Sequence, residues 1–509
     1  MLNHAKTRPR GLAIVCLTAL VVAFAWLIQP AWENERAHYA LVRALSAGKP
    51  YVDDSMSLPE LRTIDVTRLK GHTYAAKAPG LAAASLPPYL VLRAAGAETT
   101  GNPTRLVWGL HLWSIVIPAA ILLLLVRQAA DGVVPGFGTI SALSLGAATL
   151  ILPFSTLFFV HVLSATLGFA AFRFLVHERE ARSLWLIFAG GLASGLAFTV
   201  EYSLGLVALA LGFLVLAARD RIRRGTAYTL GVVTGAVPAL MFNAWAFGTP
   251  FHFSYEGWHH PGSKPLPGFL GLNEPSLKNV LEILFSPGGI APILLPAFVG
   301  AVLLWRRGAR IEAIVPFAVA GLFLAFNSAN TALFGGASPG PRYMIPALPF
   351  LAVPLAAAYR AIPGATLGLV VGGGGFIVAA TLTQALEAWD GLVLERFLSG
   401  QYVESVGSFF GFEGDAVAAV LFLLALAVAA VAAVAATPWR VRLHRDALAG
   451  VMALGAWLVL STQLRGLLER GTAGEAMVVL GVVLTAALIA FVYRMEPWLR
   501  PIQPSESEQ

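Results

Sequence analysis

Long apolar runs, each about the length of one membrane-crossing helix, most limit what this 509-residue chain can fold into. A helix needs about 20 apolar residues to cross the hydrocarbon core of a bilayer, whereas the strands of a membrane barrel are shorter and alternate in polarity. Only 12% of the residues are charged, against about 25% in soluble globular chains. The sequence therefore predicts an all-α polytopic membrane protein.

About fourteen runs meet this criterion. They lie near 11–29, 105–126, 137–153, 156–176, 184–200, 202–218, 226–247, 288–305, 311–327, 342–359, 364–385, 416–436, 447–463 and 474–493. The first run follows Lys6, Arg8 and Arg10, is too long for the apolar region of a signal peptide and has no small-residue cleavage site after it. We therefore expect an uncleaved first membrane helix.

Arginine marks every second connection between these runs. The arginine-bearing connections are 127–132, 177–183, 219–225, 305–310, 359–364, 439–446 and the tail after 493. Because cytoplasmic loops of membrane proteins are enriched in Lys and Arg, this alternation places these loops and both termini in the cytoplasm. The Ala, Gly and Arg content with short loops favours a bacterial inner membrane. The net charge of +7 lies in such loops and does not indicate a nucleic-acid partner.

The other connections are long and carry most of the remaining acids, histidines and exposed aromatic residues. They are 30–104, 248–287, 328–341 and 386–415. Residues 37, 40, 41, 44 and 45 are apolar at helical spacing, which predicts an amphipathic helix along the membrane surface, and 79–96 predicts a second one. Chemistry is therefore expected on the external, periplasmic side. The lone Cys16 excludes an intrachain disulfide.

Two acids, Glu33 and Glu35, lie directly after the first run. Partial desolvation at the membrane surface can raise the pKa of a carboxylate and suit it to act as a general base. The alternative is a helix N-terminus, with Asn34 as the cap and both acids in the first turn.

Two cations lie in external segments. Lys77 precedes Pro79 and Gly80, a pair that lets the backbone approach a ligand closely, and Arg342 follows a turn rich in glycine and proline. Either side chain can bind a phosphate. The alternative for both is contact with lipid headgroups.

Further external residues are candidates for stacking on a sugar, or alternatively for an aromatic belt at the membrane interface: His252, Tyr255, Glu256, Trp258, His259 and His260. No cofactor is predicted, because the adjacent histidines lack the spacing of a metal site on a helix; the alternative is a divalent ion. Four acids are expected to be solvated: Asp53, Asp54, Asp65 and Glu201. His111 and His161 are expected to be hydrogen-bonded core residues.

The order of these motifs resembles the GT-C superfamily of membrane glycosyltransferases, nearest to its protein O-mannosyltransferase and lipid A aminoarabinose transferase branches. The resemblance covers about residues 11–360, and Glu-Asn-Glu and Lys-Ala-Pro replace the Asp-Glu and Lys-Pro-Pro usual in the family. The matching residues are Glu33, Glu35, Arg36 and Tyr39, then Lys77 and Pro79, then Arg342, Tyr343, Pro346 and Pro349. It implies a GT-C-like catalytic module over 1–360, and we expect a scaffold of membrane helices over 361–509.

The resemblance implies transfer of a sugar from a polyprenyl phosphate to a glycan, lipid or protein acceptor, with inversion. Glu33, or else Glu35, would be the base. Phosphate would be bound by Lys77, Arg342, Tyr343 and Arg36. Substrate candidates are Tyr39, His72, Tyr74, Tyr255, Trp258 and His259. The alternatives are a lipid-linked glycan ligase, a transporter or flippase, and a non-catalytic assembly subunit; nearly charge-free spans argue against a coupled transporter.

Overall fold

The computed structural model describes residues 4–256, 272–386, 392–412 and 414–494. Helices dominate these residues, and the strands form two short antiparallel pairs. In this part of the chain, nine helices are long and apolar enough to cross a membrane, and five further apolar helices have 10–17 residues. Each corresponds to one predicted run, so the prediction of an all-α polytopic membrane protein is confirmed.

The apolar helices follow one another along the chain. They are α1 (His4–Trp26), α5 (Thr104–His111) continued by η1 (Leu112–Val116) and α6 (Ile117–Val133), α7 (Gly138–Ala147), α9 (Val160–Ala181), α10 (Leu184–Val200), η2 (Tyr202–Leu204) with α11 (Gly205–Leu216), α12 (Arg221–Phe247), α14 (Ala291–Arg306), α15 (Arg310–Ser328), η4 (Arg342–Ala347) with α16 (Leu348–Ala361), α17 (Pro363–Thr383), α19 (Asp415–Ala436), α20 (Leu443–Leu468) and α21 (Thr472–Arg494).

Shorter elements lie between them. They are β1 (Leu27–Ile28), α2 (Glu33–Ser46), α3 (Asp53–Met56), β2 (Val66–Leu69), β3 (His72–Ala75), α4 (Gly80–Ala94), α8 (Ile151–Phe154), α13 (Leu277–Phe285), α18 (Leu392–Ser399), β4 (Glu404–Ser405) and η5 (Val406–Phe410). Strands β2 and β3 form a hairpin whose two turn residues, Lys70 and Gly71, both have positive φ, as a type I′ turn requires.

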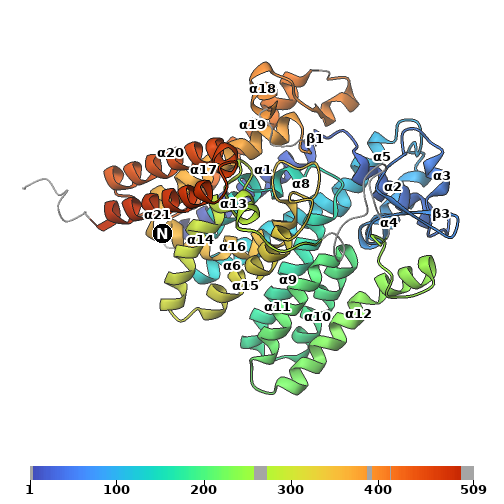
Figure 1. Ribbon diagram of the computed structural model, residues 1–509, viewed down its shortest axis with the longest axis horizontal. Helices are drawn as coiled ribbons and strands as arrows, with labels where there is room; N and C mark the ends of the chain where they lie inside the picture. Colours follow the sequence, from blue (N-terminus) through green and yellow to red (C-terminus); the bar gives the residue numbers. More distant parts are fainter. Residues whose placement is uncertain (1–3, 257–271, 387–391, 413, 495–509) are drawn as a thin grey trace, which may run out of the picture.

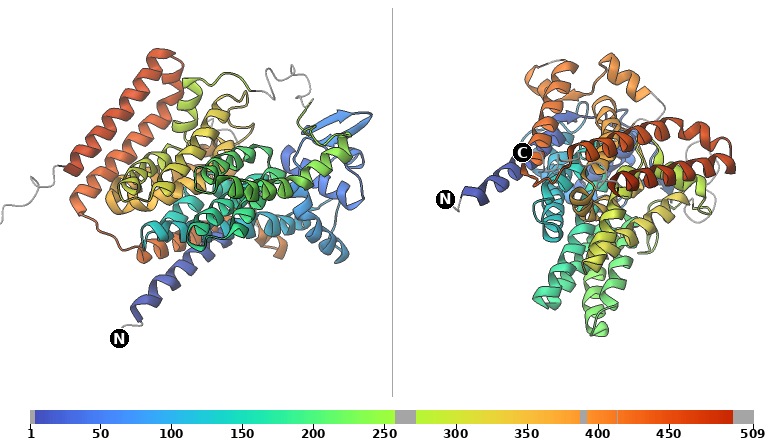
Figure 2. Two further views of the ribbon diagram at one scale, coloured as in Figure 1. Left: turned by 90° about the horizontal axis from the view of Figure 1, so that it is seen from below. Right: turned by 90° about the vertical axis from the view of Figure 1, so that its left-hand side faces the viewer.

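The segments predicted to be external meet at one end of the molecule, which we call the outer end. The Thr67 hydroxyl donates to the Glu256 carbonyl at 3.0 Å, and the Asn273 N–H donates to the Ala329 carbonyl at 2.6 Å. Strand β1 pairs with β4. In Figures 1 and 2 the elements of the first external loop gather beside the end of α12, away from α20 and α21.

Two of the predicted cytoplasmic loops are likewise joined, at what we call the inner end. The Arg224 guanidinium donates to both carboxylate oxygens of Glu178, each at 2.6 Å, which links the loops 177–183 and 219–225. Both sets of contacts agree with the alternation that the arginine pattern predicts.

Helices α10 and α12 pack with their backbones in close contact. Gly191 and Gly195 of α10 face Gly231 and Gly235 of α12, and a Cβ atom on any of the four would meet the backbone of the other helix. Small residues four apart allow this approach in membrane helices. The contact fixes the C-terminal end of α10, which is followed by Glu201.

The predicted boundary at residue 360 does not interrupt the core. The largest cluster of buried apolar residues extends from Cys16 in α1 to Ala433 in α19. The Gln29 amide donates to the Thr381 carbonyl at 2.8 Å and thereby ties the end of α1 to the end of α17. Helices α17 and α19 therefore share one interior with the helices before 360, whereas the buried apolar residues of α20 and α21 belong to two smaller clusters.

Candidate active site

Lys77 lies in the short loop between β3 and α4, where its ammonium contacts the Asp65 carboxylate at 2.8 Å. The Lys77 side chain is only 6% exposed. Burial lowers its pKa, Asp65 opposes this shift, and the nearby charge of Arg342 lowers the pKa further. The expectation that Asp65 is solvated is wrong, because the β2–β3 hairpin folds it back onto Lys77.

The Pro79–Gly80 pair starts α4, with Pro79 as the N-cap residue. A Cβ atom on Gly80 would lie 2.6 Å from the Thr199 carbonyl oxygen and from the Val200 Cα. The absence of a side chain thus lets α4 begin against the end of α10. The close backbone approach predicted for Gly80 is present, and in this structure its partner is the protein itself.

Arg342 opens η4 and lies among aromatic rings. Its guanidinium carbon is 5.6 Å from the centroid of Phe159 and 5.8 Å from that of Tyr343, distances typical of cation–π contacts. A Cβ atom on Gly335, a residue with φ of +77°, would lie 2.5 Å from Arg342 Nε. The glycine turn therefore packs directly on this arginine and fixes its side chain.

Glu33 is the first residue of α2, and its side chain is 37% exposed. One carboxylate oxygen accepts the Ile64 N–H at 2.7 Å, so Glu33 is attached to the residue before Asp65. The other oxygen is 3.8 Å from Arg36 Nη1, too long for a direct hydrogen bond. Glu33 therefore lies beside the segment that carries the partner of Lys77.

Glu35 is buried, and both of its oxygens accept backbone N–H groups, from Trp32 and from Phe158, each at 3.0 Å. Burial raises its pKa to about 7, although these hydrogen bonds act in the opposite direction. Since α2 begins at Glu33 and Glu35 accepts the Trp32 N–H, the prediction of Asn34 as the helix cap is wrong. Both acids do lie in the first turn.

Glu35 also supports the arginine indirectly. It holds the backbone of Phe158, and the next residue, Phe159, supplies one of the rings beside Arg342. The charges of Lys77 and Arg342 thus lie near each other, and Glu33 is bonded to the segment that carries Asp65, although α3 to α15 lie between Glu33 and Arg342 in the sequence. We call this group of side chains at the outer end the cluster.

A second buried carboxylate, Glu201, lies at the edge of this cluster. It accepts hydrogen bonds from Ser164 Oγ at 2.7 Å and Ser203 Oγ at 3.0 Å, and it contacts His161 Nδ1 at 3.1 Å. The His161 ring stands edge-on to Tyr343, with centroids 6.3 Å apart. Glu201 is therefore not solvated as predicted, because α10 ends inside the protein; His161 is a hydrogen-bonded core residue, as predicted.

Tyr255 approaches the cluster from the segment after α12. Its ring is partly exposed and contacts Tyr202 at 5.9 Å between centroids. Burial of its hydroxyl raises its pKa well above the ordinary value, and the neighbouring Tyr343, Glu201, Tyr202 and Asp65 raise it further. Trp258 and His259 lie outside the described residues.

The remaining substrate candidates lie elsewhere in the first external loop. His72 Nδ1 is 2.6 Å from the Asp53 carboxylate, and its ring stacks on Tyr51 with centroids 4.0 Å apart. Tyr74 packs on Phe247, with centroids 5.0 Å apart. Both residues belong to strand β3 of the hairpin, which precedes Lys77 in the chain.

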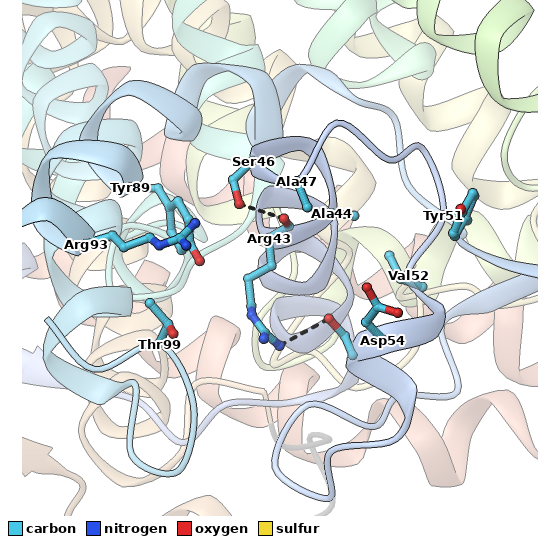
Figure 3. A pocket seen from close by; sticks show the side chains of 11 residues that line it. Arg43, Ala44, Ser46, Ala47, Tyr51, Val52, Asp54, Tyr89, Arg93 and Thr99 are labelled. Atoms are coloured by element: carbon cyan, nitrogen blue, oxygen red, sulfur yellow. Dashed lines mark hydrogen bonds between the residues drawn. The ribbon is translucent and has the colours of Figure 1, made fainter.

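Tyr39 belongs to a different surface. Its hydroxyl donates to the Thr99 carbonyl at 3.0 Å, beside a cavity of about 230 Å³ between α2, α3 and α4. In Figure 3, Arg43 and Arg93 extend toward this cavity, and the Arg43 guanidinium donates to the Ser55 hydroxyl at 3.3 Å. The cavity is lined by neither Lys77 nor Arg342.

Sequence reasoning missed Asp65 and Glu201 as members of the cluster. One signal for Glu201 was available: it is the only acid between residues 184 and 218, and an ionisable residue in such an apolar stretch usually has a buried partner. Asp65 gave no comparable signal in its polar loop. No group of three or more His, Cys, Asp or Glu side chains in the described ranges is arranged to hold a metal ion.

No protein-family model and no curated protein matches the sequence. Solved structures do resemble it. ArnT from Cupriavidus metallidurans in the apo state matches with a TM-score of 0.50 and 18% identity over 91% of this chain and 80% of that chain. The same protein bound to undecaprenyl phosphate gives 0.48 and 17%, over 96% and 77%. The Archaeoglobus fulgidus oligosaccharyltransferase gives 0.45 and 15%, over 94% and 60%. The chain therefore has the fold of the GT-C glycosyltransferases.

Proposed function

We propose that this protein is a membrane glycosyltransferase that takes a sugar from a polyprenyl phosphate and transfers it to an acceptor at the outer end. The observation that carries this proposal is the convergence of Lys77 and Arg342 in one cluster, with the Glu33 carboxylate beside it. The GT-C fold supports the same reaction class. The enzyme would lie in a bacterial inner membrane, with both termini in the cytoplasm and the active site facing the periplasm.

The two cations suit a phosphate leaving group. As the bond between the anomeric carbon and the phosphate oxygen breaks, the phosphate gains one negative charge and needs no proton from a general acid. Preorganised cations aimed at developing charge are most effective where water is excluded. Lys77, nearly buried and oriented by Asp65, and Arg342, fixed by Gly335 and two rings, meet that condition.

Glu33 is the better of the two candidates for the base. The acceptor hydroxyl attacks the anomeric carbon as it loses its proton to the carboxylate, and one such displacement inverts the configuration. Glu33 is 37% exposed and has an oxygen without a short contact, whereas both oxygens of Glu35 accept backbone N–H groups inside the protein. Glu35 then serves to position Phe158 and Phe159.

Measurements of lipid binding and of sugar transfer distinguish the residues that bind phosphate from the residue that acts as the base. In lipid nanodiscs, we expect Lys77→Met and Arg342→Met to weaken undecaprenyl phosphate binding by about tenfold or more, as charge-assisted hydrogen bonds are worth about 1.5–3 kcal/mol. Lys70→Met, an exposed lysine of the same loop, is the matched control and should bind like the wild type. If the wild type and the three variants all bind undecaprenyl phosphate equally well, the phosphate site is refuted.

Turnover is followed by mass spectrometry of envelope glycolipids and glycoproteins in a deletion strain that expresses each variant. Glu33→Gln should bind the lipid normally and lose at least about 100-fold in transfer, the usual worth of a general base. Full transfer by Glu33→Gln would show that the base is another group. A flippase would instead move lipid across the bilayer with this residue replaced.

A further inference from the structure

Among the described residues, three histidines are buried, and they differ in how their ring nitrogens are satisfied. His111 Nε2 lies 2.7 Å from the Ser155 carbonyl oxygen, and His161 Nδ1 contacts Glu201. His38 is fully buried, and neither of its nitrogens has a hydrogen-bond partner in the protein. A buried polar group left unpaired costs about 1–3 kcal/mol. Such a residue calls for a functional explanation.

His38 lies near Lys77 and His161, both of which act on it electrostatically. It follows Glu35 by one turn of α2, and its ring is edge-on to Phe158 with centroids 6.4 Å apart. Burial, Lys77 and His161 together lower its pKa well below the ordinary value, in that order of importance. The ring is therefore uncharged. It offers one N–H donor and one acceptor nitrogen, which is what a hydroxyl group needs from a partner.

The His161–Glu201 pair presents a second fixed imidazole. An ionised carboxylate only accepts hydrogen bonds, so Nδ1 carries the hydrogen and Nε2 is the atom left for another partner. Ser164 and Ser203 complete the hydrogen bonds of Glu201, so that its charge already has three donors. Neither this pair nor His38 has a task in phosphate neutralisation or in proton removal by Glu33.

We propose that His38 and the His161–Glu201 pair bind hydroxyl groups of the transferred sugar. The inference rests on the proposed function, since the sugar of such a donor is bonded directly to the phosphate that Lys77 and Arg342 hold. His38 lies near Lys77, and the His161 ring contacts Tyr343, the residue after Arg342, so both imidazoles are near the position that the sugar would occupy.

Binding of a lipid panel in nanodiscs tests the subsite. The probes are undecaprenyl phosphate alone and the same lipid carrying glucose, mannose, galactose, arabinose or an aminopentose. We expect at least one of these sugars to increase the affinity over the bare lipid. His38→Leu and His161→Leu should remove that gain, about tenfold each, because a lost hydrogen bond in such a site leaves a sugar hydroxyl unpaired. Both variants should bind undecaprenyl phosphate like the wild type.

Two further variants distinguish binding from folding. His111→Leu removes a buried histidine that is bonded to a backbone carbonyl instead of facing the cluster, and its sugar preference should be unchanged. His38→Asn retains a donor and an acceptor and should restore part of the sugar-dependent gain, which a loss of packing alone would not do.

Two results would overturn the proposal. One is an equal loss of affinity for the bare and the sugar-bearing lipids in His38→Leu and His161→Leu, which would make both residues part of the phosphate site. The other is no gain from any of the sugars. Undecaprenyl phosphate binding that is unaffected by Lys77→Met would instead refute the proposed function itself.

Discussion

The inner and outer ends of this protein differ in how completely their buried polar side chains are hydrogen-bonded. At the inner end, Glu178 is bonded through both oxygens to Arg224, and Asp446 accepts from the Tyr493 hydroxyl at 2.9 Å and from a backbone N–H at 2.7 Å. At the outer end, both nitrogens of His38 and both side-chain polar atoms of Asn327 are buried without a partner. Arg224 Nε also lacks a partner, but the other guanidinium nitrogens of that side chain are bonded, whereas the side chains of His38 and Asn327 make no hydrogen bond at all within the described part of the chain.

This difference indicates which buried polar groups contribute to stability and which are available to a ligand. Folded proteins satisfy nearly all buried polar groups, and departures concentrate where a ligand or a reaction needs them. The inner contacts are ordinary structural ones, between α9 and α12 and between α20 and α21. At the outer end, His38 retains hydrogen-bonding capacity near Lys77, as the proposed sugar site requires.

Arg224→Leu, at the inner end, is expected to have the largest effect on stability of the three substitutions that test this comparison. It leaves the Glu178 carboxylate, 4% exposed, without its partner, and breaking such a buried pair costs about 3 kcal/mol. We expect a lower thermal unfolding midpoint in detergent and unchanged undecaprenyl phosphate binding by the folded protein. The exposed neighbour is the control, and Arg223→Leu should unfold like the wild type. Impaired lipid binding in the folded Arg224→Leu protein would contradict the separation of the ends.

A smaller, pH-dependent effect is expected from Glu35→Gln. Because burial raises the pKa of Glu35 from 4.5 to about 7, the folded state binds the proton more tightly than the unfolded state. Its contribution to stability is therefore fully present below pH 4.5 and is lost as the pH rises to about 7. The variant should lack this part of the pH dependence when unfolding is measured at pH 5 and pH 8. If the free energy of unfolding differs by the same amount between pH 5 and pH 8 in the wild type and in Glu35→Gln, then Glu35 does not titrate in this range.

The smallest effect is expected from Tyr39→Phe. It removes the hydrogen bond to the Thr99 carbonyl, worth about 1 kcal/mol, in a part of the outer end that is separate from Lys77 and Arg342. A slight decrease in unfolding temperature with unchanged lipid binding and transfer is the expected outcome. If transfer falls while stability holds, Tyr39 belongs to the substrate site after all, as the sequence motif predicted.

Most of the architecture could be predicted because the bilayer imposes it locally. Each apolar run needs only its own composition to be recognised, and the arginines beside it indicate which end it faces. For the same reason Lys77 and Arg342 were expected on one side of the membrane. The interfacial helix at 33–46 also follows from its own periodicity, and its predicted apolar residues Ala37, Ala40, Leu41 and Ala44 are buried.

The partners within the site were not predictable in this way. Asp65 reaches Lys77 through a hairpin turn, and Glu201 is enclosed because Gly80 allows α4 to start against α10. Both acids have the composition of surface residues, and their burial depends on contacts between segments distant in sequence. The local sequence pattern does not specify those contacts.

The sequence by itself determined a polytopic helical protein, the alternation of its loops and the common side of its cations, since hydropathy and charge act on each segment separately. Only the tertiary structure decided that Lys77 pairs with Asp65, that His161 pairs with Glu201 and that His38 is buried without a partner. These arrangements follow from how closely α2, α4, α9 and α10 pack together, which is a property of all four helices jointly.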